Sequence, residues 1–207
     1  MTLAQSAPLL AEVAGVFLLG VVSPGQNFMF LTTQAARSRR AGLAVAVGFG
    51  LAALTWSALT ALGLGALAAR APWAAVALRW LGAGYQLHVG LGMLLARGSL
   101  PTLTTASAAL AGRHALGRGF AMSLLNPKAA AFYTGVLAQM LPHDAPAALD
   151  VAVAAILFAV AAGWYGGLAL GFSTGVVQRA YMRVERHVRL ASGVLIIALG
   201  ARLALGL

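Results

Sequence analysis

Long apolar runs, separated by short polar segments, form the main pattern of the chain. A run of about 20 apolar residues can cross the hydrocarbon core of a bilayer as an α-helix. The pattern predicts such helices at 8–34, 42–69, 73–95, 119–141, 147–172 and 190–207. We therefore expect an all-α integral membrane protein with about six transmembrane helices, since helices satisfy their own backbone groups in lipid.

A weak internal similarity divides the chain into two halves of three predicted helices. The segment FLLGVVSP at 17–24 aligns with FAMSLLNP at 120–127, so each half has a proline seven residues after a phenylalanine. An odd number of helices per half reverses the direction of the second half, as in the inverted repeats of many secondary transporters. The predicted organisation is one transmembrane transporter domain, 1–207, with repeat one at about 8–95, a connector at 96–116 and repeat two at about 117–207.

Composition supports lipid as the solvent of this chain. Hydrophobic residues make up 61% of the sequence and charged residues 9%, whereas soluble domains contain about 25% charged residues. A soluble fold of 207 residues keeps too much exposed surface to hide so many apolar side chains. The excess of 14 Lys+Arg over 4 Asp+Glu does not indicate nucleic-acid binding, because the arginines lie between apolar runs.

The positions of the arginines predict the orientation of the helices. They cluster in the first, third and fifth loops, at Arg37, Arg39, Arg40, Arg97, Arg113, Arg118, Arg179, Arg183, Arg186 and Arg189. Cytoplasmic loops carry such an excess, so we expect both termini in the periplasm and the chain in a bacterial inner membrane. No basic residue precedes the first run, which indicates a retained helix rather than a secretory signal peptide. Residues 177–188 are interpreted as an anchored cytoplasmic loop, with an interfacial helix as the alternative.

Polar residues and a proline interrupt the first helix of each half. Proline inside a spanning helix removes a backbone donor and disturbs the carbonyl four residues earlier. Freed backbone groups are tolerated in a membrane only beside protein or a water-filled cavity, so paired interruptions predict a substrate site near the midplane. The candidate substrate-binding residues are Ser23, Pro24, Gly25, Gln26, Asn27, Asn126, Pro127 and Lys128.

Lys128 is the charged residue of this predicted site. It lies ten residues after Arg118, about 15 Å along a helix and therefore near the bilayer centre, where a charge is costly. Lys128 could bind a substrate carboxylate or exchange a proton during transport, and the sequence does not separate these roles. His88, beside Tyr85, is a second candidate for proton coupling, although a hydrogen-bonded structural histidine is the simpler interpretation.

Acidic residues are scarce in the predicted helices. Glu12 lies near the end of the first helix, and the remaining acids fall in or beside loops. A site for a dibasic substrate would need buried carboxylates, whereas this site offers amides, carbonyls and one cation. The pattern favours a neutral or acidic amino acid, with a neutral one preferred.

Other kinds of chemistry find no support in the sequence. There is no cysteine, which excludes disulfides and thiol chemistry. The sequence has no nucleotide-binding or metalloprotease motif, and its four histidines lack metal-ligand spacing. We expect neither an enzyme nor a bound metal or cofactor. Glycines at 163, 167, 171 and 175 predict close helix packing.

Several segments together resemble the LysE/RhtB family of amino-acid exporters of the threonine/homoserine type. The most specific match is GF…NPKA at 119–129, and VSPGQN at 22–27 is similar to the PGPN-type motif of the family. LGAGYQLHVG at 81–90 and the segment 192–203 resemble the third and sixth helices. The resemblance covers nearly the whole chain. It implies a secondary exporter of amino acids or related small metabolites, driven by the proton gradient, with site residues at Pro24, Asn27, Asn126, Pro127 and Lys128.

The chain departs from the family pattern at three positions. Gln26 replaces a second proline, Ala53 stands where many members have an acidic residue, and Trp56 replaces a frequent histidine. Two other functions are alternatives: a metal or inorganic-ion exporter of a related six-helix type, and a membrane scaffold without transport. The expected partners are an amino acid, protons and the lipid bilayer, without nucleic acid. The sequence is compatible with a homo-oligomer.

Overall fold

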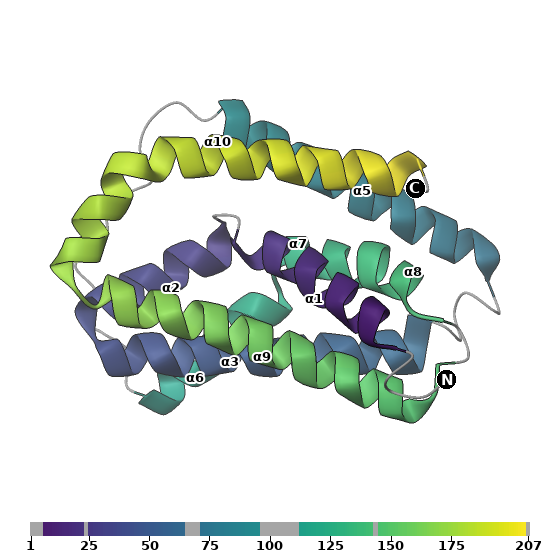
Figure 1. Ribbon diagram of the computed structural model, residues 1–207, viewed down its shortest axis with the longest axis horizontal. Coiled ribbons are helices and arrows are strands. Elements are labelled where there is room, and N and C mark those ends of the chain that lie inside the picture. The colour runs from purple at the N-terminus through teal and green to yellow at the C-terminus, as the bar shows by residue number, and fades with distance from the viewer. Residues whose placement is uncertain (1–5, 23–24, 65–70, 96–111, 143–144, 206–207) are drawn as a thin grey trace.

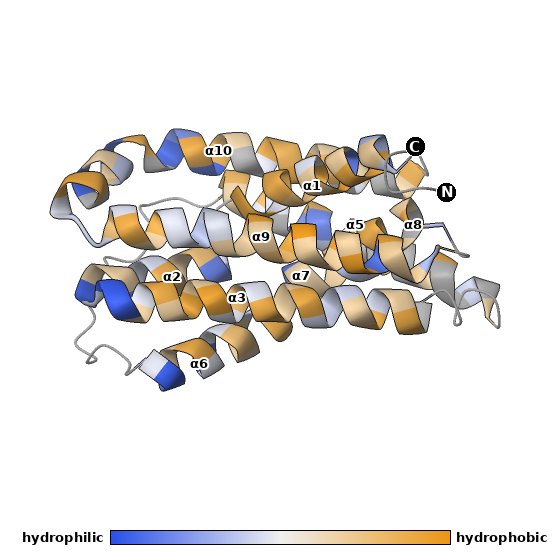
Figure 2. Ribbon diagram, turned by 60° about the horizontal axis from the view of Figure 1, so that its bottom comes forward, coloured by the Kyte–Doolittle hydropathy of each residue, from blue (hydrophilic) through white to orange (hydrophobic). Residues whose placement is uncertain are grey.

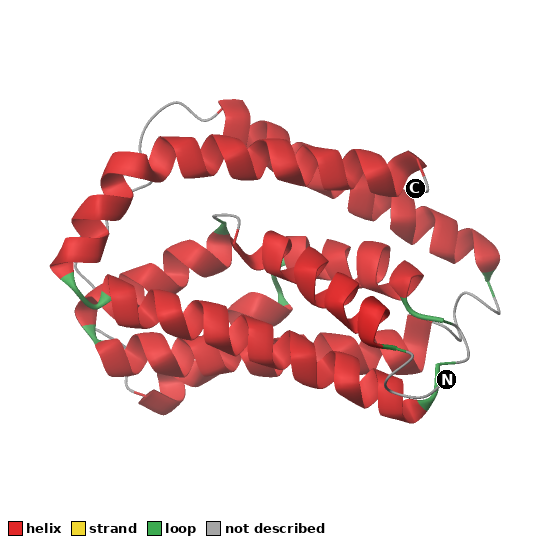
Figure 3. Cartoon of the chain, in the orientation of Figure 1, coloured by secondary structure: helices red, strands yellow, loops and turns green. Residues whose placement is uncertain are grey.

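A computed structural model describes residues 6–22, 25–64, 71–95, 112–142 and 145–205, and the assigned elements in these ranges are all helical (Figures 1 and 3). The α-helices are α1 (Ala7–Val22), α2 (Gln26–Arg37), α3 (Arg39–Leu59), α5 (Pro72–Leu95), α6 (Gly112–Leu124), α7 (Pro127–Ala131), α8 (Ala138–Met140), α9 (Ala147–Phe172) and α10 (Gly175–Leu205). Two wider π-helical segments, η1 (Thr60–Leu64) and η2 (Phe132–Leu137), continue α3 and α7. The all-helical prediction is therefore confirmed for the described residues.

Two helices in the described ranges are long and apolar enough to cross a membrane, Arg39–Leu62 and Ala147–Phe172. The pair α1 and α2 meets the same criterion jointly, although the two helices are bent by 65° at the break between them. Helix length and composition therefore establish two spans in these ranges, or three if the bent pair is one span, rather than the six predicted from the sequence.

The main core lies where α3 packs against α6 and α9, with α1 and α2 packed beside α9. Its centre is a set of fully buried aliphatic and aromatic side chains: Val13, Leu31, Val45, Phe49, Leu137, Leu149, Val153 and Leu157. The rings of Phe49 and Tyr165 meet edge to face, with centroids 4.7 Å apart. Burial of these side chains holds the core helices in place beside the two helix breaks described below.

Glycines bring the backbones of α3 and α6 into direct contact. A Cβ atom at Gly48 would clash with the Leu116 carbonyl oxygen, and one at Gly119 would lie 2.8 Å from that of Val45. Two of the glycines predicted to pack, Gly163 and Gly167 of α9, do not have this role. A Cβ at either would meet no atom within 4 Å in the described part of the chain, because both positions are exposed.

A second unit consists of α5 and α10, which lie along each other in Figure 1. Gly90 and Gly193 allow the close approach, since a Cβ on either would lie about 3 Å from the carbonyl oxygen of the other: 2.9 Å and 3.0 Å. Buried Arg189 of α10 donates to the Met93 carbonyl at 2.7 Å, near the end of α5. The pair meets the rest of the molecule mainly where α5 packs on α7 and η2.

The prediction of a loop at 177–188, followed by a helix from 190, is wrong. One continuous helix, α10, runs from Gly175 to Leu205. Its first half contains helix-forming Arg, Met and Glu residues and no proline that would end the helix. The connector predicted at 96–116 is also too long, since α6 begins at Gly112; residues 96–111 lie outside the described ranges.

The described arginines of the predicted cytoplasmic loops lie at one end of the molecule. The turn between α2 and α3, the start of α6 and the first half of α10 are at this end, where Figure 2 shows hydrophilic ribbon. The start of α1 and the end of α10 lie at the opposite end (Figure 1). The arginine-rich segments, which are separated in the sequence, are thus gathered at one end of the long axis of the fold.

The contact between α3 and α6 predicts that Gly48→Ala is destabilising. The new methyl group would meet backbone atoms of α6, which cannot rotate away, so overpacking should cost about 1–3 kcal/mol and lower the melting temperature by roughly 3–10 °C. Circular dichroism of the detergent-purified protein measures this change. Gly117→Ala is the matched control, because a Cβ at Gly117 meets nothing within 4 Å among the described residues. An equal melting temperature for both variants would contradict this packing.

Candidate functional site

Two helix breaks, one in each half of the chain, lie next to each other. In the first half, α2 begins after Gly25, whose backbone is extended. In the second half, α6 ends at Leu124 and α7 begins at Pro127, the first helical position, where a missing N–H has no cost. Asn126 caps α7, because its Oδ1 accepts a hydrogen bond from the Lys128 N–H at 2.9 Å. The local sequence Asn-Pro-Lys therefore restarts a helix directly after ending one.

The carbonyl that Pro127 was expected to release has a partner. The Ser123 carbonyl accepts from the Asn126 N–H at 3.3 Å, which tightens the last turn of α6. The polar groups available to a ligand at this break are therefore side chains rather than this carbonyl.

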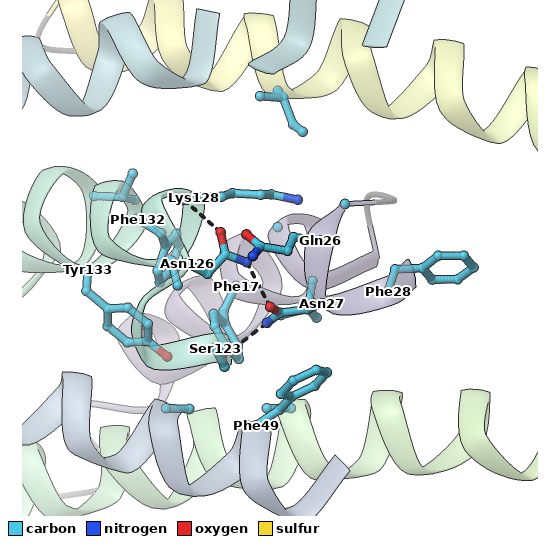
Figure 4. A pocket seen from close by; sticks show the side chains of 18 of the residues that line it. Phe17, Gln26, Asn27, Phe28, Phe49, Ser123, Asn126, Lys128, Phe132 and Tyr133 are labelled. Atoms are coloured by element: carbon cyan, nitrogen blue, oxygen red, sulfur yellow. Dashed lines mark hydrogen bonds between the residues drawn. The ribbon is translucent and has the colours of Figure 1, made fainter. Parts of the chain in front are cut away.

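Three buried side chains connect the two breaks. Asn126 Nδ2 donates to Asn27 Oδ1 at 2.8 Å, and Asn27 Nδ2 donates to Ser123 Oγ at 3.1 Å (Figure 4). Asn27 lies in the first turn of α2. Ser123 lies in the last turn of α6 and Asn126 between α6 and α7, almost 100 positions away in sequence. We name this group the asparagine clasp. It satisfies polar groups that would otherwise be buried without partners.

A cavity of about 80 Å³ lies beside the clasp. Roughly 15 Å³ of such space holds one water molecule, so the cavity has room for a small solute. Its wall is mostly apolar, and its described polar side chains are Gln26, Asn27, Gln86, Ser123, Asn126, Lys128, Tyr133 and Tyr165. None of the described lining residues is Asp or Glu.

Aromatic rings form one part of the cavity wall. Phe17 of α1 and Phe132 of η2 lie with centroids 5.3 Å apart. Tyr133 also faces the cavity, and its ring stacks on Trp56 of α3 with centroids 5.6 Å apart and an angle of 7° between the planes. The stack places the Tyr133 hydroxyl at a fixed position, because the ring is held on one face by the indole.

Lys128 brings a cation to this wall. It follows Asn126-Pro127 in the first turn of α7, and Figure 4 shows its side chain extended beside Asn126 and Gln26. Gln26 is exposed, and its Nε2 donates to Met122 Sδ at 3.2 Å. A cation in a mostly apolar wall attracts an anionic group far more strongly than it would in water.

Most of the predicted site residues meet at this cavity. Gly25, Gln26, Asn27, Asn126 and Lys128 line it. Pro127 begins α7 without being one of the lining residues, and Ser23 and Pro24 lie outside the described ranges. His88, predicted as a second proton-coupling candidate, is exposed on α5 and does not line the cavity.

Sequence reasoning missed four polar lining residues: Gln86, Ser123, Tyr133 and Tyr165. Gln86 could have been found, because an uncharged polar residue in a long apolar helix indicates a buried partner or a site. Tyr133 and Tyr165 gave no such indication, since a tyrosine in a membrane helix often lies at the lipid interface. In the described part of the chain, no group of three His, Cys, Asp or Glu residues is placed to hold a metal ion.

Comparison with known proteins identifies the class. The family model of the LysE type translocator matches residues 18–206. An uncharacterized membrane protein of Pseudomonas aeruginosa is 33% identical over 189 residues, 86% of this chain and 85% of the relative. The chain therefore belongs to the LysE type translocator family, and it is a membrane protein of a transporter family.

Two further relatives have names that state a function. A threonine efflux protein of Salmonella typhi is 26% identical over 202 residues, 94% of this chain and 97% of the relative. The threonine efflux protein of Escherichia coli K12 is 24% identical over the same shares of the two chains. No solved structure matches this chain.

The asparagine clasp predicts that Asn27→Ala destabilises the protein by about 1–3 kcal/mol, since it removes two hydrogen bonds and leaves two buried partners unpaired. Melting followed by circular dichroism in detergent measures this loss. Thr33→Val is the control in the same helix, because Thr33 Oγ1 donates to the Met29 carbonyl one turn away, at 2.8 Å, within α2 itself. A loss no larger for Asn27→Ala than for Thr33→Val would show that the clasp does not hold the breaks together.

Proposed function

We propose that this protein is a secondary active exporter of small neutral amino acids across the bacterial inner membrane, driven by the proton gradient. The observation that carries the proposal is the cavity, which combines the cation of Lys128 with neutral polar groups and a mostly apolar wall. Membership of a translocator family and relatives named threonine efflux protein support the amino-acid class. Because the described lining contains no acid, a dibasic substrate would place extra positive charge beside Lys128 without compensation.

The proposed architecture is six transmembrane helices in two inverted three-helix repeats. The six would be α1–α2, α3–η1, α5, α6–α8, α9 and α10. Two features support it: the first helix of each half is broken near a proline, and the two breaks meet at one cavity. Broken helices at corresponding positions of two repeats are typical of secondary transporters.

Substrate binding would begin with the carboxylate at Lys128. The first turn of α2, with Gly25, Gln26 and Asn27 on the cavity wall, adds the positive end of a 12-residue helix to the same site. The apolar wall around Phe17 and Phe132 would then receive a short side chain. Lys128 would therefore provide binding free energy, whereas the cavity volume would limit the size of the substrate.

Transport requires that the cavity open to each side of the membrane in turn. The cavity lies at the boundary between two units: Gln86 of α5 and Ile196 and Leu199 of α10 line one side. The broken helices line the other. Rocking of the α5–α10 pair against the remaining helices would change access without breaking the close contact between Gly90 and Gly193.

Proton coupling has a separate requirement. A residue that carries the proton must change its charge during the cycle, and Lys128 is the ionisable amine on the described cavity wall. Because the gradient drives protons inward while the substrate moves outward, the carrier must take up a proton on the periplasmic side after the substrate leaves and release it to the cytoplasm before the next substrate is exported. A Lys128 that holds the substrate carboxylate as a cation is protonated during the outward step, so carboxylate binding and proton carrying are alternative roles of this residue.

Lys128 variants separate substrate binding from proton coupling. If Lys128 binds the carboxylate, Lys128→Ala should reduce both gradient-driven export and exchange at zero gradient of labelled L-threonine by about tenfold to a hundredfold. Proteoliposomes containing the full chain measure both rates. If Lys128 only carries the proton, exchange at zero gradient persists in Lys128→Ala while driven export is lost.

Lys128→Arg is the charge-preserving comparison. It keeps the cation but changes its shape and reach, so it should retain more binding than Lys128→Ala and transport more slowly than the wild-type protein. Wild-type rates for Lys128→Ala under both conditions would refute a transport role for this residue, and absence of amino-acid transport by the wild-type protein would refute the proposed function.

Orientation in the membrane gives an independent prediction. Because the chain lacks cysteine, single cysteines introduced by Ala71→Cys, Ala145→Cys and Thr174→Cys report accessibility without background. Intact bacterial cells are treated with a thiol reagent that crosses the outer membrane but not the inner membrane. Ala71→Cys and Ala145→Cys should react with it in these cells. Thr174→Cys, next to the arginine-rich end, should react only after the inner membrane is opened. Reaction of Thr174→Cys in intact cells would contradict the inverted-repeat topology.

A further inference from the structure

Gln86 has a buried side-chain oxygen that accepts no hydrogen bond from the described residues, and its side chain lines the cavity. It lies in the middle of α5, its side chain is 7% exposed, and it lines the cavity. Its Oε1 atom has no hydrogen-bond partner among the described residues. Gly200 of α10 packs against it, since a Cβ at that position would lie 3.0 Å from the Gln86 Cβ. The backbone that carries Gln86 is therefore held close to α10 on one side.

Tyr133 presents a second unpaired polar atom to the same cavity. Its side chain is 2% exposed, and its hydroxyl has no hydrogen-bond partner in the described part of the chain. The ring cannot easily turn to find one, because it is stacked on Trp56. Buried polar atoms normally have partners, and those left without one in a cavity are typical of a place where a ligand supplies the missing hydrogen bond.

The charged groups on the cavity wall indicate which group of a ligand would bond these two unpaired atoms. A free amino acid brings a carboxylate and an ammonium group only a few bonds apart. Lys128 suits the carboxylate, but the described lining has no Asp or Glu for the ammonium. The ammonium is a donor without acceptor capacity, so it requires neutral acceptors such as an amide oxygen or a hydroxyl oxygen. Gln86 and Tyr133 offer these two atoms.

We propose that Gln86 Oε1 and the Tyr133 hydroxyl bind the α-ammonium group of the substrate while Lys128 binds its carboxylate. This inference rests on the proposed function and adds the residues that make an amino acid, rather than any small carboxylic acid, the preferred ligand. Gln86 belongs to the α5–α10 unit, whereas Lys128 belongs to α7 and Tyr133 to its continuation η2. One zwitterion would therefore connect the two units through polar contacts, and a ligand without an ammonium group would lack the hydrogen bond to the α5–α10 unit.

The test compares ligands that differ only in the ammonium group. Isothermal titration of the purified full-length protein measures the Kd of L-threonine and of 3-hydroxybutyrate, and of L-valine and 3-methylbutyrate. The wild-type protein should bind each amino acid at least about tenfold more tightly than its partner acid, since hydrogen bonds to a charged group are among the stronger ones. In Gln86→Met, which has similar volume and no amide oxygen, this ratio should fall about fivefold while the Kd of the acids stays unchanged, and the remaining preference is the share of Tyr133.

Three further variants make the result specific. Gln86→Glu keeps an acceptor of the same length, so it should keep or increase the preference for amino acids. Tyr133→Phe keeps the stack on Trp56 and removes the hydroxyl, and it should reduce the ratio by a smaller factor, about threefold. Tyr85→Phe removes a hydroxyl from the same turn of α5 outside the described cavity lining, and it should leave the ratio unchanged.

Equal weakening of amino acids and acids in Gln86→Met, or no change in the ratio, would overturn the proposed role of Gln86. If Gln86→Met does not fold, loss of the amino-acid preference in Gln86→Glu would do the same. Failure of the wild-type protein to bind either amino acid would refute the proposed substrate class itself. These results are distinguishable, because the ratio is interpreted only where the wild-type protein binds the amino acid.

Discussion

Polar backbone and side-chain groups must find partners when a helix is interrupted inside an apolar bundle, and the asparagine clasp is where this chain meets that requirement. Asn126 restarts a helix by capping α7, and its Nδ2 reaches the other break at 2.8 Å. Asn126 thus serves its own half and the opposite half simultaneously, whereas Asn27 bonds two side chains of the second half. The cavity depends on this arrangement, because the clasp allows two helices to stop next to one another without exposing unpaired groups to an apolar environment.

The remainder of the fold divides according to how closely its helices approach. Backbone contact at Gly48 and Gly119 joins α3 to α6, and contact at Gly90 and Gly193 joins α5 to α10. Between these two units lie the cavity and the side chains of α7 and η2. A boundary filled by side chains and solute changes shape at a lower free-energy cost than direct contact between two helix backbones, so the proposed movement occurs at this boundary.

Local rules were sufficient for much of the architecture. The bounds of α9 agree with the apolar run at 147–172, and the Asn-Pro-Lys segment indicated a break that the structure places between α6 and α7. The first half of α10 was missed because its arginines suggested a loop, although nothing in that segment interrupts a helix. Tertiary packing decided the rest: no spacing rule distinguishes Gly48, which touches a neighbouring backbone, from Gly163, which faces outward, or brings Gln86 opposite a helix far away in sequence.

Trp56 stands where the family often has a histidine, and its contacts bear on the fluorescence of the protein. Its indole stacks on Tyr133 at 7° between planes, and Tyr133 faces the cavity. Indole emission responds to the polarity and contacts of its immediate surroundings. Trp73 and Trp80 are 75% and 55% exposed, and Trp164 precedes the cavity-lining Tyr165 in the sequence. A ligand that shifts Tyr133 would therefore change the emission of Trp56 through the stack, and binding to the proposed site would be visible without a chemical label.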